Sequence, residues 1–162
     1  LAQLDSGTLE LKRVRITFPD LVARASAHLQ VPMELKEISF RTTGASDAGL
    51  TCDPNWTAEA LTNVLKNCVE HTPPGGQIQV SWAESPIISE LRVSDNGEGI
   101  DKTDLPHIFE RFYKGRNSSK ESIGIGLAMA KTIIERQLGS IQVMSAAGKG
   151  TEFTLQFFKQ IM

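Results

Sequence analysis

Cysteine is scarce in this sequence. The chain contains only Cys52 and Cys68, sixteen positions apart, and no Cys-x-x-Cys pair. Two isolated cysteines cannot form a framework of several disulfides, and they do not supply the paired ligands of a structural zinc site. We therefore expect both thiols to pack in the core of a protein that folds in a reducing compartment.

A surplus of either charge is also absent, because 17 lysines and arginines stand against 19 aspartates and glutamates, for a formal net charge of −2. This balance gives no electrostatic footprint for nucleic acid or for an acidic membrane surface. No apolar run approaches the roughly 18 residues of a membrane-spanning helix, and the chain does not open with a signal peptide. We therefore expect this stretch to be soluble, with no nucleic acid among its partners.

An initiator methionine is missing as well. The chain of 162 residues begins at Leu1, and we expect it to be a piece of a longer protein. Its length suits one compact domain. Residues 1–8 are expected to be the end of an upstream helix or a linker, and residues 9–162 the domain itself.

The spacing of apolar residues predicts a mixture of helices and strands. Strands are expected near residues 9–16, 37–42, 50–52, 77–83, 90–94, 140–145 and 151–157. Helices are expected over residues 20–36, from about 57 to a stop at 73–76, and over 125–137. Pro32 would bend the first of these helices or start its final turn. The strands that flank the turn at 84–89 predict a sheet that is at least partly antiparallel. Residues 100–122 lack a sustained period, and a connection of this length is usually a functional lid.

The helix near residue 57 places four polar side chains on one face at intervals of four residues. They are Glu59, Asn63, Asn67 and His71. Asparagine disfavours helix interiors and its amide is costly to bury without a partner, so Asn63 and Asn67 require one. A hydrated Mg²⁺ ion with bound phosphates is such a partner, because the amide oxygen is a neutral hard ligand and Mg²⁺ takes few protein ligands. The alternative is a polar face exposed to solvent.

The segment Asp95-Asn96-Gly97-Glu98-Gly99 directly follows a predicted strand. An ionised carboxylate only accepts hydrogen bonds, so Asp95 suits an exocyclic amine such as that of adenine, directly or through water. Gly97 and Gly99 would let the backbone approach a flat ring without an obstructing Cβ. The alternative is an Asn-Gly hairpin turn, although the residues after Gly99 do not resemble a partner strand.

The segment Gly124-Ile125-Gly126-Leu127 opens the last predicted helix, where free N–H groups and the helix dipole favour phosphate. It is not the dinucleotide-binding fingerprint, because no strand precedes it and Met129 stands in place of the third glycine. Residues 148–151 are not a Walker A motif, because the earlier glycine is missing. Any nucleotide-binding fold here is therefore neither of the two commonest kinds.

Between the two glycine segments, residues 109–116 interleave aromatic and cationic side chains within the predicted lid. The aromatic side chains would dock the lid on an apolar surface, and Arg111, Lys114 or Arg116 would offset phosphate charge. The alternative is a solvated loop with one hydrophobic anchor.

In this order, these stretches resemble the catalytic ATP-binding domain of sensor histidine kinases, a branch of the GHKL ATPase superfamily. The matching motifs are the N box at 63–67, the first glycine box at 95–99, the F box at 109–112, the second glycine box at 124–127 and the closing glycine-threonine motif at 148–153. Each motif alone is loose, but their order and spacing are specific, and the resemblance covers almost the whole chain. The family implies an α/β fold, a two-layer sandwich of a mixed sheet packed on helices. ATP would lie between the N-box helix and the lid.

The resemblance also implies roles for individual residues, with ATP and Mg²⁺ as the cofactors. Asn67, with Asn63 beside it, would hold Mg²⁺, and these amides would serve catalysis together with Glu59. Asp95 would recognise adenine. The implied nucleotide-binding residues are Asn63, Asn67, His71, Asp95, Gly97, Gly99, Ile100, Lys114, Arg116, Gly124, Ile125, Gly126, Leu127 and Thr151.

Two positions depart from the family pattern. Glu70 stands where relatives often carry a lysine or arginine that reaches phosphate, and a carboxylate there would repel it. That expectation therefore shifts to Arg111, Lys114 and Arg116. Ser122 stands where a further glycine is frequent, so the hinge of the lid is expected to be stiffer than usual.

None of the three histidines, His28, His71 and His107, has the sequence context of the family's phosphoacceptor, which lies on a separate helical hairpin. The resemblance therefore implies that this chain supplies the γ-phosphoryl group to a histidine outside it, for onward transfer to the receiver domain of a response regulator. The full-length protein is expected to be a homodimer anchored in the bacterial membrane with this domain in the cytoplasm, and this piece alone to be a monomer. Two alternatives stay open: a degenerate ATP-binding signalling module, and a GHKL serine kinase that acts on a separate protein.

Overall fold

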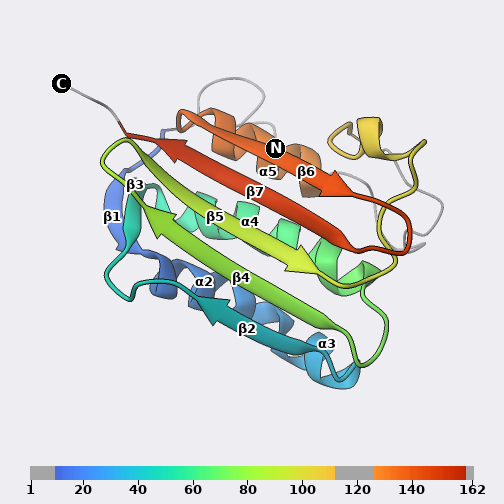
Figure 1. Ribbon diagram of the computed structural model, residues 1–162. Coiled ribbons are helices and arrows are strands. Elements are labelled where there is room, and N and C mark those ends of the chain that lie inside the picture. Colours follow the sequence, from blue (N-terminus) through green and yellow to red (C-terminus); the bar gives the residue numbers. More distant parts are fainter. Residues whose placement is uncertain (1–9, 112–125, 160–162) are drawn as a thin grey trace.

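The computed structural model describes residues 10–111 and 126–159. They fold into two layers, a five-stranded sheet and a layer of helices that covers one of its faces (Figure 1). Along the sheet the strands follow the order β2-β4-β5-β7-β6. Their bounds are Ser39–Thr43 for β2, Gln77–Glu84 for β4, Ile88–Asp95 for β5, Gly139–Ser145 for β6 and Thr151–Phe158 for β7.

The sheet is mixed. Strand β2 runs parallel to β4, whereas the pairs β4–β5, β5–β7 and β7–β6 are antiparallel. A separate antiparallel pair joins β1 (Val14–Thr17) to β3 (Gly49–Cys52). The predicted α/β class, with a mixed sheet packed against helices, is therefore confirmed.

Helix α4 (Pro54–His71) crosses the sheet and carries the asparagine face predicted from the sequence. It begins at Asp53, whose Oδ1 accepts hydrogen bonds from the backbone N–H groups of Asn55 and Trp56, both at 3.1 Å. Its apolar side chains recur at helical spacing and are buried together with those of α5 (Gly126–Glu135), the helix beside it. No helix in the described ranges, the 18-residue α4 included, is apolar enough over a sufficient length to cross a membrane.

The helix predicted over residues 20–36 is broken into three pieces. They are α2 (Phe18–Ser26), a short 3-10 turn at Ala27–Leu29, and α3 (Gln30–Leu35). Pro32 explains the break, because it has no N–H to donate to the carbonyl of residue 28 and its ring crowds that carbonyl. The backbone therefore tightens one turn before the proline. The predicted effect of Pro32 on this helix is observed, although the interruption is a 3-10 turn that precedes the proline.

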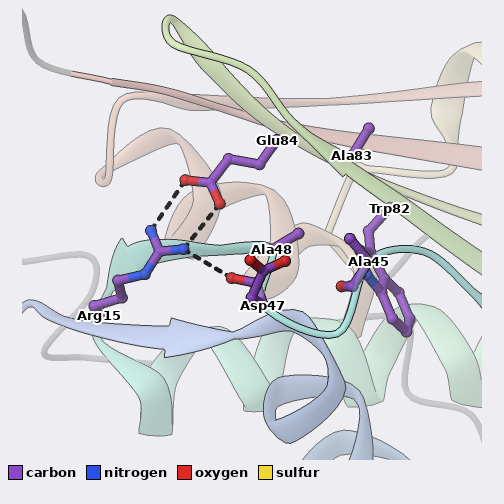
Figure 2. Close-up of a pocket in the computed structure, with 7 residues that line it drawn as sticks. All are labelled: Arg15, Ala45, Asp47, Ala48, Trp82, Ala83 and Glu84. Carbon is purple, nitrogen blue, oxygen red and sulfur yellow. Dashed lines mark hydrogen bonds and ion pairs between the residues drawn. The ribbon is translucent and has the colours of Figure 1, made fainter.

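A pocket of about 400 Å³ opens beside the end of β4 (Figure 2). Its lining residues are Arg15, Ala45, Asp47, Ala48, Trp82, Ala83 and Glu84. The indole N–H of Trp82 donates to the backbone oxygen of Ala45 at 2.9 Å, and Arg15 and Glu84 are already paired with each other. The eight residues of β4, from Gln77 to Glu84, put this pocket roughly 20 Å from the glycine segment at 95–99, which lies at the other end of the strand. It is therefore a separate feature from the predicted nucleotide site.

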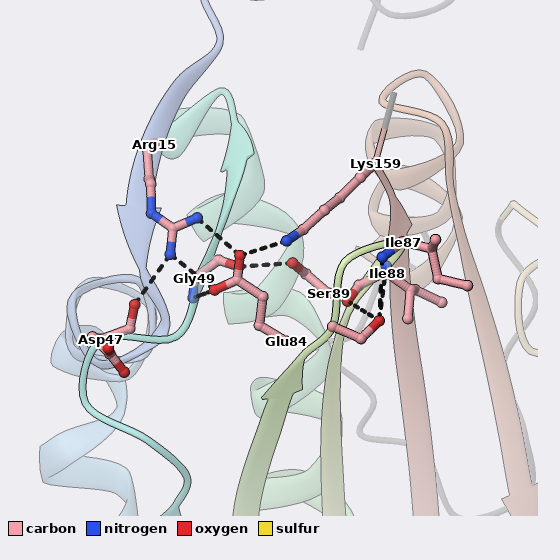
Figure 3. Close-up of polar contacts among 9 residues, drawn as sticks. Arg15, Asp47, Gly49, Glu84, Ile87, Ile88, Ser89 and Lys159 are labelled. Carbon is pink, nitrogen blue, oxygen red and sulfur yellow. Dashed lines mark hydrogen bonds and ion pairs between the residues drawn. The ribbon is translucent and has the colours of Figure 1, made fainter. Parts of the chain in front are cut away.

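Glu84 joins three parts of the chain next to this pocket (Figure 3). Its carboxylate accepts two hydrogen bonds from Arg15, at 2.8 and 3.0 Å, one from the Gly49 N–H at 2.9 Å and one from Lys159 Nζ at 2.7 Å. Hydrogen bonds from Arg15 and Lys159 hold the pKa of Glu84 well below its usual value of 4.5. Glu84 thus fastens the β1–β3 pair and the end of β7 to the end of β4.

We expect Glu84→Ala to lower the free energy of unfolding by about 1 to 2 kcal/mol at neutral pH, since it removes charge-assisted hydrogen bonds that are only partly exposed. Because the pKa of Glu84 is lower in the folded state than in the unfolded state, its contribution is complete above pH 4.5 and declines as the pH falls below that value. Urea unfolding at pH 7 and pH 3 measures both effects. The control is Glu34→Ala on the exposed surface of α3, and an equal loss in the two variants would contradict the assignment.

Candidate functional site

The polar face of α4 meets the beginning of α5. Asn63 is partly buried, and a Cβ added to Gly126 would lie 3.3 Å from the amide oxygen of Asn63. The amide nitrogen of Asn63 is buried and has no hydrogen-bond partner among the described residues. An orphaned buried amide costs stability unless another group pairs with it. The first asparagine and the second glycine segment, far apart in the sequence, therefore border one polar site.

Asp95 is the last residue of β5, the central strand of the sheet, and is only 8% exposed. Its Oδ1 accepts a hydrogen bond from the Gly97 N–H at 2.9 Å, but its Oδ2 has no partner among the described residues. Burial raises the pKa of Asp95 above its usual value, although the Gly97 N–H, the Cys68 thiol and the Thr151 backbone oppose that rise. Asp95 therefore offers a buried acceptor oxygen that a ligand with an N–H group could satisfy.

The loop after Asp95 folds over the end of α4. A Cβ added to Gly97 would lie 2.3 Å from the backbone oxygen of His71, and the Glu98 N–H donates to that same oxygen at 3.3 Å. The imidazole Nδ1 of His71 lies 3.0 Å from a carboxylate oxygen of Glu98. The loop therefore continues toward α4 and does not turn back as a partner strand, so the alternative of an Asn-Gly hairpin is wrong.

On its other side, Asp95 pairs with Thr151 of β7 in the antiparallel register. A Cβ at Gly150 would lie 2.1 Å from the backbone oxygen of Asp95, so the closing glycine-threonine segment packs directly on this strand end. The hydroxyl of Thr151 shares a hydrogen bond with Ser145, whose Oγ also accepts from the Ile100 N–H at 2.8 Å. Ile100 is buried. Ser145 thus joins the segments on both sides of Asp95, a role that its place in the sequence does not signal.

Phe109 anchors the start of the predicted lid. Its ring packs edge-to-face on Phe153 of β7, with centroids 6.4 Å apart, and Lys131 of α5 lies 5.6 Å above it. The predicted apolar docking of this segment is present at Phe109. Residues 112–125 are outside the described ranges, and with them Lys114, Arg116, Ser122, Gly124 and Ile125, whose predicted roles therefore stay predictions.

A family model for histidine kinase-, DNA gyrase B- and HSP90-like ATPases matches residues 52–161. The matched region runs from the end of β3 through β7 and contains every residue of the site described in this subsection. The chain belongs to this ATPase family. The prediction of a GHKL ATPase domain that uses ATP is therefore confirmed.

Curated relatives of this ATPase domain are sensor kinases. The chain is 38% identical over 110 residues to the sensor histidine kinase YvrG of Bacillus subtilis, a match that covers 67% of this chain and 19% of that protein. It is 30% identical over 160 residues to the sensor protein CzcS of Cupriavidus metallidurans, covering 97% of this chain and 33% of that protein. The chain thus spans between about a fifth and a third of the length of these relatives. It is a catalytic ATPase domain of the sensor-histidine-kinase type.

Three solved structures of histidine kinases are similar to this chain. The mycobacterial sensor histidine kinase MprB has a TM-score of 0.77 and 25% identity, covering 93% of this chain and all of that one. The catalytic domain of histidine kinase ThkA has a TM-score of 0.79 and 20% identity, with 91% of this chain and 96% of that chain covered. Full-length ShkA in complex with AMPPNP has a TM-score of 0.81 and 20% identity, covering 99% of this chain and 34% of that chain. The last two support the fold alone.

In this ATPase domain the predicted site residues fall into groups. Asn63 lies beside Gly126, His71 beside the glycine loop, and Asp95 beside Thr151. Asn67 is partly buried on the same face of α4, and Glu59 is exposed one turn before Asn63.

The side chain of Leu127 packs against the hydrophobic core, so only the backbone of Leu127 is suited to a ligand. The expected burial of both cysteines is observed, and Cys68 packs beside Asp95.

We expect Gly99→Ala to destabilise the domain by about 2 kcal/mol or more beyond the effect of Gly148→Ala. Both glycines have nearly the same left-handed backbone, with φ of 77° and 78°, so the conformational cost is matched. Only at Gly99 would the added Cβ meet a neighbour, the backbone oxygen of Ala146 at 2.1 Å, whereas Gly148 faces open space. Denaturant unfolding of the two variants measures the difference. Equal stabilities would show that the loop over Asp95 is not closely packed.

Proposed function

We propose that the whole protein is a sensor histidine kinase in which this domain binds Mg-ATP and supplies its γ-phosphoryl group to a histidine outside the chain. The observation that carries the proposal is the buried Oδ2 of Asp95 at the end of β5, which no group within residues 10–111 and 126–159 hydrogen-bonds. A buried carboxylate oxygen without a partner is costly, and the exocyclic amine of adenine is a donor that removes this cost. The family match and the sensor-kinase relatives support the same ligand.

Mg²⁺ is proposed to bind at Asn67 with Asn63 beside it. The donor set fits, since amide oxygens are hard neutral ligands and Mg²⁺ ordinarily completes its shell with water and phosphate oxygens. The orphaned amide nitrogen of Asn63 is consistent with a site whose polar partners come with the nucleotide. When bound, the ion would neutralise charge on the phosphates. Glu59, on the same face of α4, is proposed to assist catalysis near these amides.

The protein's own contribution to the reaction is positioning. Asp95 and Thr151 would fix the base, with Gly97, Gly99 and Ile100 shaping the surface on which it lies. The first turn of α5, from Gly126, would direct backbone N–H groups at the phosphates, with Gly124, Ile125 and Leu127 continuing that surface. Lys114 and Arg116 would offset phosphate charge. The bond between the γ-phosphorus and the bridging oxygen of ATP breaks as a bond from the acceptor imidazole nitrogen forms.

The acceptor histidine is proposed to lie outside this chain, on an upstream helical hairpin that also forms the contacts of a homodimer. Two of the chain's histidines already lie next to carboxylates: His71 at the end of α4 beside Glu98, and His107 beside Glu110 at 2.8 Å. A structural neighbour of this fold, ThkA, has been solved in complex with the response regulator TrrA. We propose a receiver domain as the partner here too, with the full-length protein anchored in the membrane, its residues 1–8 continuing the upstream hairpin, and this domain in the cytoplasm.

A second candidate function is a signalling module that binds ATP without transferring phosphate. Glu70 favours it, because this carboxylate occupies the last turn of α4 where a phosphate-binding cation would be expected. Incubating the full-length protein with ATP radiolabelled at the γ-phosphate separates the two functions. We expect an acid-labile label on histidine. ATP binding without any label would favour the second candidate, and an acid-stable label on another protein would favour a serine kinase.

We expect Asn67→Ala to weaken Mg-ATP binding at least about tenfold, because Mg²⁺ would lose a ligand while the fold stays intact. Titration calorimetry with ATP, with and without Mg²⁺, measures the change, and the loss should be much smaller without the ion. Asn55→Ala is the matched control, since Asn55 is an exposed asparagine in the first turn of the same helix. Unchanged affinity of the Asn67→Ala variant would refute the proposed magnesium site.

A further inference from the structure

Glu98 contacts His71 in two ways. Its backbone N–H donates to the backbone oxygen of His71 at 3.3 Å, and its Oε1 lies 3.0 Å from the Nδ1 of the His71 ring. The His71 side chain is 13% exposed and that of Glu98 45% exposed, so the ring is largely buried and its carboxylate partner is the more exposed of the two. The loop that carries Glu98 starts at Asp95, whose Oδ1 accepts a hydrogen bond from the Gly97 N–H, so the ring lies beside the segment that carries the carboxylate proposed to bind adenine.

The carboxylate determines which ring nitrogen of His71 carries hydrogen. A carboxylate can only accept, so Nδ1 must be the protonated nitrogen of this contact. In the neutral ring Nε2 is then an acceptor, and the ring is held in one orientation by its partner. His71 lies one helical turn after Asn67 and is beside the loop that borders Asp95. The imidazole ring that Glu98 holds in place therefore borders the proposed nucleotide site.

The side chain of Glu98 is not needed to hold the loop itself. The loop is fastened through its backbone: the Gly97 N–H donates to Asp95 at 2.9 Å, the Glu98 N–H to His71, and the Glu98 carbonyl accepts from the Gly148 N–H at 2.6 Å. These contacts survive truncation of Glu98 at Cβ. What truncation removes is the partner of the His71 ring.

We infer that Glu98 is a positioning residue that fixes the tautomer and orientation of His71 against the nucleotide base. This inference rests on the proposed function, since the ligand of this site is the adenine nucleotide. Glu98 itself makes no contact with the nucleotide in this arrangement. Its effect passes entirely through the ring of His71.

We expect Glu98→Ala to weaken Mg-ATP binding by the full chain about fivefold, the effect of losing one ordinary hydrogen bond that orders a binding group. Glu98→Gln, whose amide oxygen can still accept from Nδ1–H, should recover most of the lost affinity. Calorimetry measures both values. The ¹⁵N shifts of His71, recorded without nucleotide, should show Nδ1–H in the parent and in Glu98→Gln, and a mixture of tautomers in Glu98→Ala.

A double variant tests whether Glu98 affects ATP affinity only through the ring of His71. In a His71→Phe background, which keeps a ring but removes the hydrogen bond, Glu98→Ala should change ATP affinity little further. An equal fivefold loss in that background would overturn the inference, as would unchanged ¹⁵N shifts in Glu98→Ala. If the parent chain binds ATP and Glu98→Ala binds it equally well, only this inference fails. If the parent binds no ATP, the proposed function fails with it.

Discussion

The carboxylate of Asp95 is buried at the end of the central strand, with one oxygen bonded to the Gly97 N–H and the other without a hydrogen-bond partner in the part of the chain that the structure describes. A buried charge needs partners from several directions, and here they come from separate segments. The glycine loop provides one N–H, the closing segment packs on the Asp95 backbone through Gly150, and α4 brings Cys68 alongside. The remaining oxygen is the acceptor left for a ligand.

The topology of the sheet explains why these segments meet. Strand β5 lies between β4 and β7 and is antiparallel to both, so the end of β5 coincides with the beginnings of its two neighbours. Both connections at this end must therefore pass Asp95. Helix α4 ends at the same end of the strands and contributes His71, while α5 starts beside Asn63. The site therefore lies at the end of the central strand, beside the last turn of α4 and the first turn of α5.

At the opposite end of these strands, the charge of Glu84 is neutralised within the fold. Glu84 at the end of β4 accepts hydrogen bonds from Arg15, Gly49 and Lys159, which satisfies both of its carboxylate oxygens. The two carboxylates differ in this respect: both oxygens of Glu84 accept hydrogen bonds, whereas the Oδ2 of Asp95 has no hydrogen-bond partner among the described residues. The carboxylate at the end of β4 therefore stabilises the fold, whereas the one at the end of β5 keeps an acceptor oxygen for a ligand.

Local pattern alone determined much of this domain. The four-residue spacing of the asparagines follows from helical geometry, and the position of Asp95 at a strand end follows from alternation, so both could be predicted without tertiary information. The order of the motifs gave the family. Pro32 also predicted a bend in the helix over residues 20–36, but not that the interruption would be a 3-10 turn at Ala27–Leu29, because the helical period of apolar residues continues through it.

Only the tertiary structure decided which residues meet. His71 and Glu98 are 27 positions apart, and Glu84 is 69 positions from Arg15 and 75 from Lys159. Contacts over such separations depend on strand pairing and on where helices end against the sheet, and no local period encodes them. The sequence by itself therefore determined the type of each element and the chemistry that each carries. The pairing of β5 between two antiparallel neighbours decided that these residues lie together around the carboxylate of Asp95.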